Sequence, residues 1–181
     1  MAGLAGSPQS HGEMGYIRVI AADLDGTLLA PDHTLSPDAR ESVKEALSKG
    51  TCVCLASGRP ANSMAHVARD LFESPDGLPI VCFNGALAIV MDPEGHAKRK
   101  LFEAKLPTTV VLMVLELSAE WGYPVQWCSL EHTLNNATSK EQEHLLRAIE
   151  EIDGNVSETH DLLALTRSGE TPLKLVMVTG R

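Results

Sequence analysis

Three short apolar runs, separated by two helix-like segments, constrain the fold of this chain most. The runs are "IRVIAADL" (17–24), "TCVCLAS" (51–57) and "LPIVCFN" (78–84), each bounded by turn residues. Continuous apolar runs of this length are typical of strands buried on both faces. The intervening segments, 36–50 and 61–72, carry apolar residues at helical spacing. This β-α-β-α-β alternation predicts an α/β fold with a parallel sheet and right-handed crossovers.

The first helix has clear boundary signals. Ser36 is a candidate N-cap, Pro37 occupies the first helical position, and Gly50 follows the last apolar residue of the pattern. Serine caps, an N-terminal proline and a C-terminal glycine are typical helix ends. We therefore expect a helix between the first two strands.

The pattern changes after Asn84. The segment 85–104 predicts two strands around the turn "DPEG", followed by a helix over 107–122 and a strand over 123–129. Ser139 and Gln142 form a capping-box pattern that predicts a helix through about Ile152. Two closing strands are predicted at 160–166 and 172–179. This second block resembles an α+β module with an antiparallel sheet, and its aromatic residues are expected in its core: Trp121, Tyr123 and Trp127.

Charge and composition exclude several function classes. The chain has 181 residues, and a net charge of −9 argues against a nucleic-acid partner, because phosphate-backbone binding needs clustered Lys and Arg. No apolar run reaches bilayer length, so no membrane partner is expected. Residues 1–16 lack the apolar region of a signal peptide and are expected to form a flexible tail. The four cysteines are interpreted as buried thiols in a reducing, cytoplasmic setting, and the oligomeric state is not readable from the sequence.

Two carboxylates, Asp23 and Asp25, follow the first apolar run directly. Carboxylates this close repel each other unless a cation or hydrogen-bond donors compensate. A calcium loop is excluded because Leu28 occupies its invariant glycine position and Thr34 its last ligand position. A plain acidic turn or helix cap remains possible, but it leaves the buried strand that delivers the two carboxylates unexplained.

Phosphoryl transfer explains the pair better. A carboxylate can attack phosphorus, a second carboxylate can serve as acid and base, and Mg²⁺ can offset the repulsion between nucleophile and phosphate. The donors for the phosphoryl oxygens should come from a neighbouring strand end. Ser57 and Gly58, at the end of the second apolar run and ahead of a helix, offer a hydroxyl and an amide for that purpose.

The sequence around these residues resembles the haloacid dehalogenase superfamily. "DLDGTLL" (23–29) is similar to its DxDGT nucleophile motif, and "ASGRP" (56–60) to its second motif. With "VCFNGA" (81–86), the match is similar to the Cof-like sugar-phosphatase branch, in which a large α/β cap is inserted after the third strand. The resemblance implies a partial Rossmannoid core over residues 17–86 and a cap over 87–181.

The resemblance also implies residue roles. Asp23 would be the nucleophile and Asp25 the acid and base, and the Asp23 carboxylate and the Asp25 main-chain carbonyl would ligate Mg²⁺. The other site residues would shape the motif loop, bind phosphate or flank the substrate: Gly26, Thr27, Ser57, Gly58, Arg59 and Asn84. The expected substrate is a small phosphorylated metabolite, most simply a sugar phosphate.

Two family motifs are not found in these residues: a lysine after the cap and an acidic pair that completes the metal site. Lys174 lies within an apolar strand pattern and is interpreted as a cap residue, and Asp153 and Asp161 form no acidic pair. The resemblance therefore predicts that the second half of the core is absent and that the chain is truncated after the cap. Three hypotheses stay open: a Mg²⁺-dependent phosphatase, a non-catalytic remnant that binds a phosphorylated ligand or a partner, and a phosphomutase of the same fold.

Overall fold

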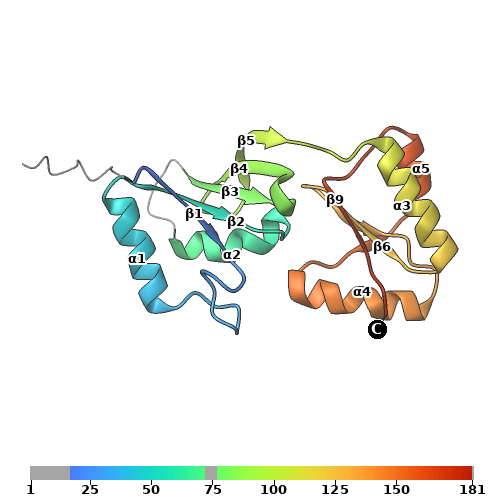
Figure 1. The fold of residues 1–181 in the computed structure, drawn as a ribbon, viewed down its shortest axis with the longest axis horizontal. Helices are drawn as coiled ribbons and strands as arrows, with labels where there is room; N and C mark the ends of the chain where they lie inside the picture. The colour runs from blue at the N-terminus through green and yellow to red at the C-terminus, as the bar shows by residue number, and fades with distance from the viewer. Residues whose placement is uncertain (1–16, 72–76, 181) are drawn as a thin grey trace, which may run out of the picture.

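The computed structural model describes residues 17–71 and 77–180, which form two sheets with associated helices (Figure 1). The first sheet has the strand order β1-β2-β3-β4-β5. Its strands are β1 (Val19–Asp23), β2 (Cys52–Ala56), β3 (Leu78–Cys82), β4 (Leu87–Met91) and β5 (Ala97–Glu103). Strands β1 to β3 are parallel, whereas β4 and β5 are antiparallel. The predicted α/β fold with a parallel sheet is thus confirmed. The N-terminal tail predicted for residues 1–16 lies outside the described residues.

Two helices connect the parallel strands, α1 (Pro37–Ser48) and α2 (Ala61–Leu71). Helix α1 begins as predicted, because the Ser36 hydroxyl accepts the Ala39 N–H at 3.2 Å and Pro37 is its first residue. An ion pair between Arg40 Nη2 and Asp70 Oδ2, at 2.7 Å, joins the two helices. Both helices therefore pack on one face of the sheet, against the same apolar cluster.

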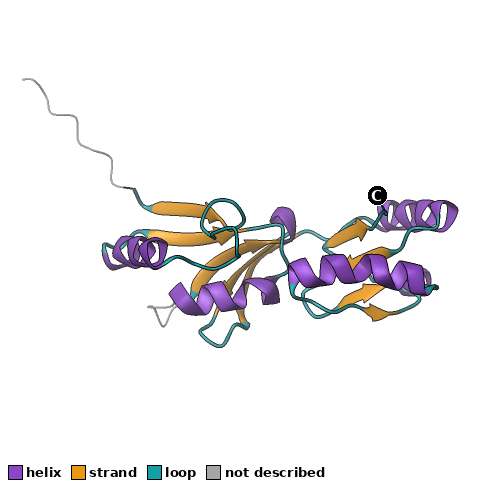
Figure 2. Cartoon of the chain, turned by 90° about the horizontal axis from the view of Figure 1, so that it is seen from below, coloured by secondary structure: helices purple, strands orange, loops and turns teal. Residues whose placement is uncertain are grey.

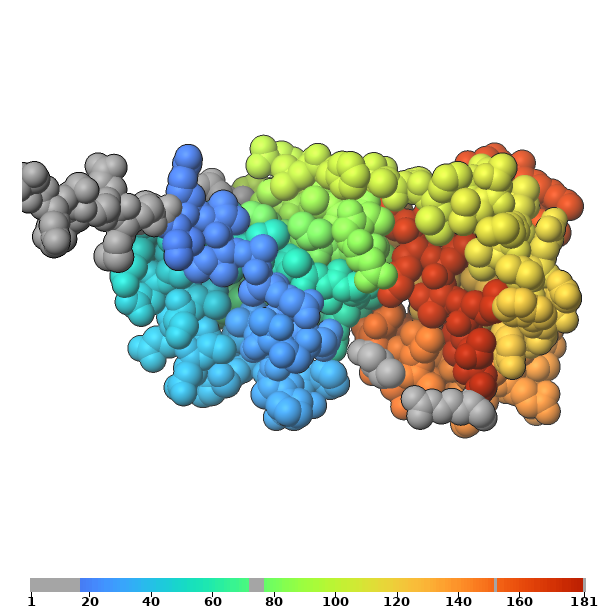
Figure 3. Space-filling view, viewed as in Figure 1, coloured from blue at the N-terminus to red at the C-terminus, as the bar shows by residue number. Residues whose placement is uncertain are grey.

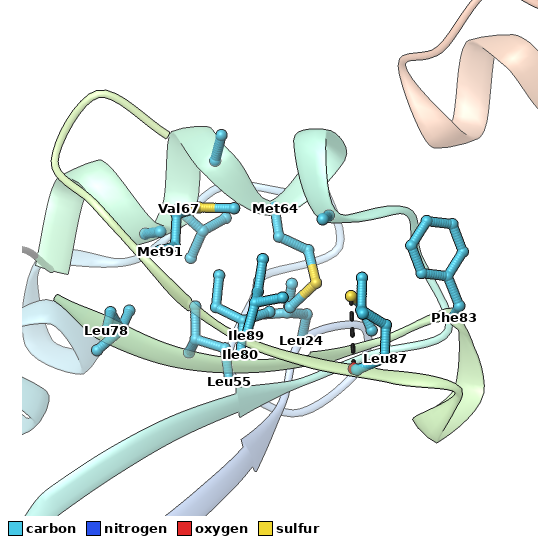
Figure 4. Close-up of a cluster of buried hydrophobic side chains, with 14 of the residues drawn as sticks. Leu24, Leu55, Met64, Val67, Leu78, Ile80, Phe83, Leu87, Ile89 and Met91 are labelled. Carbon is cyan, nitrogen blue, oxygen red and sulfur yellow. Dashed lines mark hydrogen bonds between the residues drawn. The ribbon is translucent and has the colours of Figure 1, made fainter. Parts of the chain in front are cut away.

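That cluster is the main core of the chain (Figure 4). Helix α2 contributes side chains such as Met64 and Val67, which pack against Leu55 and Ile80 of the sheet. Leu24, which separates the two aspartates of the motif, is fully buried in the same cluster. Its burial anchors the turn after β1 to the core, so the flanking carboxylates are held in a fixed position.

Strand β1 is more exposed than its sequence predicts. We expected burial on both faces, but Val19 is 60% exposed and Ile20 38% exposed. The reason is position, because β1 pairs only with β2 among the described strands and forms an edge of the sheet. Cys52, at the start of β2 opposite Val19, is also exposed, so the expectation of four buried thiols holds for Cys82 and Cys128 and is wrong for Cys52.

The hairpin at residues 85–104 forms as predicted, but it belongs to the first sheet. Strand β4 pairs with β3, with Leu78 opposite Met91 and Cys82 opposite Leu87. The sheet therefore continues past residue 86 to Glu103, since β4 and β5 add to its edge. We define residues 17–103 as the first module and residues 104–180 as the second module. The assignment of core and cap functions to these parts stays a prediction.

The second module is built on a separate sheet with the order β8-β7-β6-β9. Its strands are β6 (Val125–Cys128), β7 (Thr133–Asn135), β8 (Glu158–Thr159) and β9 (Lys174–Met177), and its helices are α3 (Thr108–Trp121), α4 (Lys140–Asp153) and α5 (Leu162–Arg167). Strand β6 pairs antiparallel with β7 and β9, whereas β7 and β8 are parallel. Helix α4 lies across the sheet from α3 and α5 (Figures 1 and 2). The predicted α+β organisation is confirmed, with one parallel pair in the sheet.

Two expectations for the second module are wrong. Residues 162–167 form helix α5 instead of a strand, and Asp161 caps it by accepting the Ala164 N–H at 2.9 Å. A short apolar run fits either a strand or one face of a helix, and here the cap selects the helix. Trp127 is buried in the module's core as expected, but Trp121 is 55% exposed at the end of α3.

In the described part of the chain, no helix has both the length and the apolar character needed to cross a membrane.

Candidate active site

The predicted site residues gather at the carboxyl ends of β1, β2 and β3. Asp23, the last residue of β1, lies opposite Ala56, the last residue of β2. The Ser57 N–H then donates to the Val81 carbonyl of β3 at 2.9 Å, so the ends of the three strands are level. Ligands of parallel sheets bind beyond these ends. The structure thus brings Asp23 and Ser57, 34 positions apart in the sequence, to one edge.

The turn after β1 presents both aspartates to solvent. The Leu28 N–H donates to the Asp23 carbonyl at 3.1 Å, and the Leu29 N–H donates to the Leu24 carbonyl at 2.9 Å. Gly26 has φ +76°, a left-handed conformation that a side chain would strain. With Leu24 buried below, the Asp23, Asp25 and Thr27 positions all lie exposed on the outer side of the turn.

Asp25 is held by a bidentate ion pair with Arg59. The guanidinium donates from Nε to Oδ2 at 2.8 Å and from Nη2 to Oδ1 at 2.6 Å. The Arg59 hydrogen bonds lower the pKa of the Asp25 carboxyl below its usual value, although partial burial opposes them. In this arrangement Asp25 is a stabilised carboxylate. It can act as a proton donor only after the guanidinium has moved to another acceptor.

His33 joins this pair, and the sequence did not indicate it. Its Nδ1 lies 3.2 Å from Asp25 Oδ1 and 3.1 Å from Arg59 Nη2. One ring nitrogen cannot both donate to the carboxylate and accept from the guanidinium, so the tautomer decides which contact forms. His33 also has φ +60°, which is uncommon outside glycine. No spacing in the sequence predicts its contact with Arg59, a residue after β2.

The loop after β2 (residues 57–60) is tightly constrained, and we call it the phosphate loop because the sequence predicts that it binds phosphate. The Arg59 N–H donates to the Ser57 hydroxyl at 3.2 Å, and the Phe83 N–H donates to the Arg59 carbonyl at 3.0 Å. A Cβ at Gly58 would lie 2.3 Å from Asn84 Oδ1, so only glycine permits this approach of Asn84. Asn84, in the short 3₁₀ turn Phe83–Gly85, therefore lies against the loop, with φ +56°.

Two residues of the second module reach the same area. Lys174, at the start of β9, donates from Nζ to the Gly58 carbonyl at 3.0 Å. Burial raises the pKa of Asp153, the last residue of α4, while the charges of Lys174 and Arg59 lower it and that of Asp25 raises it. Lys174 is thus a residue of the second module, as interpreted from the sequence, but it also touches the phosphate loop.

These residues provide only some of the ligands that a magnesium ion needs. Across residues 17–71 and 77–180, no three His, Cys, Asp or Glu side chains are grouped closely enough to hold a metal ion. The Asp25 carboxylate is already bonded to Arg59, which leaves the Asp23 carboxylate and the Asp25 main-chain carbonyl as candidate ligands. Mg²⁺ requires near-octahedral coordination, so these two groups do not make a complete site.

Known proteins with similar sequences are phosphatases by name. A family model described as haloacid dehalogenase-like hydrolase matches residues 20–179. The chain is 33% identical over 106 residues to 5-amino-6-(5-phospho-D-ribitylamino)uracil phosphatase YitU of Bacillus subtilis, covering 58% of this chain and 36% of that protein. It is 35% identical over 105 residues to pyridoxal phosphate phosphatase YbhA of Escherichia coli, covering 57% of this chain and 35% of that protein.

Solved structures show the same fold. The structure of TM0651 from Thermotoga maritima matches with a TM-score of 0.70 at 23% identity, covering 91% of this chain and 57% of that one. A haloacid dehalogenase-like hydrolase from Bacteroides thetaiotaomicron matches with a TM-score of 0.68 at 24% identity, covering 82% and 54%. In all these comparisons the matched region covers less than two thirds of the related protein.

Proposed function

The chain belongs to the haloacid dehalogenase-like hydrolases, and from this membership and the site geometry we propose that its residues hydrolyse a small phosphate monoester. The observation that carries the proposal is the position of Asp23. It ends β1 beside the phosphate loop, with Asp25 two residues away on the same anchored turn. A carboxylate that could serve as nucleophile, a second carboxylate, and a hydroxyl and an amide that could bind phosphate therefore lie near the carboxyl ends of parallel strands, which supports the proposal.

The proposed reaction has two steps. An Asp23 carboxylate oxygen attacks phosphorus and forms an acyl phosphate, while the alcohol leaves with a proton from Asp25. Asp25 then removes a proton from water, which attacks the same phosphorus, so phosphate is released and the Asp23 carboxylate is restored. Ser57 and Gly58 would hold the phosphoryl oxygens through the hydroxyl and the amide.

The ion pair between Asp25 and Arg59 adds a condition to this mechanism. Because Arg59 holds Asp25 ionised, protonation of Asp25 requires a second acceptor for the guanidinium. An incoming phosphate is such an acceptor, since arginine binds phosphate and carboxylate with the same bidentate geometry. We infer that phosphate binding moves Arg59 from Asp25 to the substrate, which frees Asp25 to be protonated.

The proposal for magnesium concerns which groups would bind the ion. The Asp23 carboxylate and the Asp25 carbonyl would provide two of its ligands, and the ion would reduce the charge repulsion between nucleophile and phosphate. Groups beyond these two, including water, would complete the coordination.

The proposed substrate class is a small phosphorylated metabolite, with a sugar phosphate as the first candidate. Support comes from the names of two relatives, which specify phosphorylated ribityl and pyridoxal compounds. Neither name fixes the substrate here, because each match covers little more than a third of the relative.

The test compares wild-type protein with Asp23→Asn on p-nitrophenyl phosphate and a panel of sugar phosphates. Both are assayed as purified residues 1–181. We expect Asp23→Asn to lower turnover by a factor on the order of 10³ or more, because only binding and electrostatic catalysis remain. Asp38→Asn, an exposed residue in the first turn of α1, is the matched control and should have wild-type activity.

A second candidate is favoured by the stabilised Asp25 carboxylate and the incomplete metal ligand set: a domain that binds a phosphorylated ligand without turnover. Phosphate binding by residues 1–181 without hydrolysis would support it. Near wild-type hydrolysis by Asp23→Asn would instead contradict the aspartate mechanism.

A further inference from the structure

A hydrogen bond links the second module to the phosphate loop. Lys174 Nζ donates to the Gly58 carbonyl at 3.0 Å across 116 positions of sequence. Among the residues that the structure describes, this carbonyl is the hydrogen-bond acceptor of the Lys174 ammonium group. The contact therefore couples β9 directly to the loop that is proposed to bind phosphate.

The surrounding interface holds Lys174 in this position. Leu173, its neighbour, is 4% exposed and packs with Cys128 into the core cluster of the first module. Cys128 is also paired with Lys174 in the sheet, so the first residue of β9 is attached to β6. The start of β9 is thus fixed by buried apolar contacts.

Polar contacts from α4 add to this interface. The Ser63 hydroxyl of α2 donates to the Asp153 carbonyl at the end of α4. The side-chain amides of Asn62 and Asn155 form two reciprocal hydrogen bonds, at 2.9 and 3.2 Å. The second module therefore contacts the first residues of α2, directly after the phosphate loop.

The bond to Gly58 acts on one peptide unit. The Gly58 carbonyl and the Arg59 N–H belong to the same planar trans peptide, so they point in opposite directions. Lys174 holds the carbonyl, and the N–H donates to the Ser57 hydroxyl at 3.2 Å. Rotation of this peptide would break both bonds together. The Lys174 ammonium group and the Ser57 hydroxyl thus contact the two ends of one peptide unit.

We propose that Lys174 is a positioning residue of the phosphate site, acting on the Ser57 hydroxyl through the Gly58–Arg59 peptide. This inference rests on the proposed function of the loop. It implies that residues of both modules form the phosphate site. Lys174 differs from a lysine that touches the nucleophile, because its acceptor is the Gly58 carbonyl.

The first experiment measures binding of inorganic phosphate by ³¹P NMR at a fixed Mg²⁺ concentration. We expect Lys174→Met to weaken phosphate binding by roughly tenfold, the order of one charge-assisted hydrogen bond. Lys174→Arg should restore most of the affinity, because a guanidinium can also donate to the carbonyl. Lys140→Met, at the exposed start of α4, is the control and should bind as wild type.

A double-mutant cycle separates positioning from general loosening of the interface. If Lys174 acts through Ser57, Lys174→Met should add little to the effect of Ser57→Ala on phosphate affinity. Fully additive losses would overturn the inference, since they would mean that the lysine contributes independently of the hydroxyl.

A direct measurement distinguishes this inference from the proposed function. Hydrogen exchange of the Arg59 amide should accelerate in Lys174→Met, whereas exchange of core amides in β3 should stay unchanged. Unchanged protection of the Arg59 amide would overturn the inference even if phosphate binds. Failure of the wild-type protein to bind phosphate would overturn the proposed function. In that case the exchange rate of the Arg59 amide would still show whether Lys174 positions the Gly58–Arg59 peptide.

Discussion

Arg59 is the most constrained charged residue of the site. Its side chain is 9% exposed, while that of its partner Asp25 is 43% exposed, so the buried guanidinium depends on a carboxylate that water also reaches. Removing a partner from a buried charge is costly, because the charge then stays desolvated without compensation. Replacing Asp25 should therefore lower the free energy of unfolding by more than the exposure of that aspartate alone suggests.

The pH dependence of stability should reveal this pair. Because Arg59 lowers the folded-state pKa of Asp25, the ionised pair stabilises the fold above the unfolded-state pKa, which is about 3.8. That stabilisation is lost as pH falls through the lower folded-state pKa. We expect wild type to be more stable than Arg59→Met at pH 7, with the gap narrowing below about pH 4. Urea unfolding at pH values from 7 to 3 checks this, and a gap that widens in acid would contradict it.

Among the secondary-structure elements, β1 combines two roles that conflict. It delivers Asp23 to the site, and it is also an edge strand. Apolar side chains are exposed on it and just before it: Ile17, Val19 and Ile20. Unpaired backbone groups beside exposed apolar side chains favour pairing with other chains. Residues 1–181 should therefore self-associate through this edge.

Val19→Lys tests this expectation, because a charge on an edge strand opposes pairing with another chain. Sedimentation velocity at increasing concentrations should show less self-association for Val19→Lys than for wild type. Leu101→Lys changes an equally accessible apolar residue on β5, at the opposite edge of the sheet, and serves as the control. If the two variants self-associate to the same extent, or if wild type stays monomeric, the chain does not self-associate through β1.

At the scale of the whole molecule, the site is assembled from two modules but lacks a full set of metal ligands among the described residues. Mg²⁺ gives up its waters reluctantly and needs several anionic oxygens for tight binding. Calorimetric titration of residues 1–181 should therefore show weak Mg²⁺ binding. The binding should not saturate at low millimolar Mg²⁺, because the ion keeps most of its water ligands. Asp23→Asn should weaken it further, while Asp38→Asn should not. Tight, saturable binding by residues 1–181 would contradict this prediction.

Local sequence patterns predicted the strands and helices of the first module, and the two aspartates and the loop after β2 in the candidate site. The apolar runs, the Ser36 and Ser139 caps and the glycine turns each depend on neighbouring residues, so their structures could be predicted directly. The positions of Asp23 and Ser57 at one sheet edge followed from the same patterns, because parallel strands place their carboxyl ends together.

Tertiary structure decided the features that depend on distant neighbours. Exposure of β1 and inclusion of β4 and β5 in the first sheet both depend on which segment packs alongside. The contacts of Arg59 with Asp25 and of Lys174 with Gly58 join residues 34 and 116 positions apart. No local pattern specifies such contacts, because burial and charge pairing are set by the folded neighbours of a side chain, whereas strands and caps are set by its neighbours along the chain.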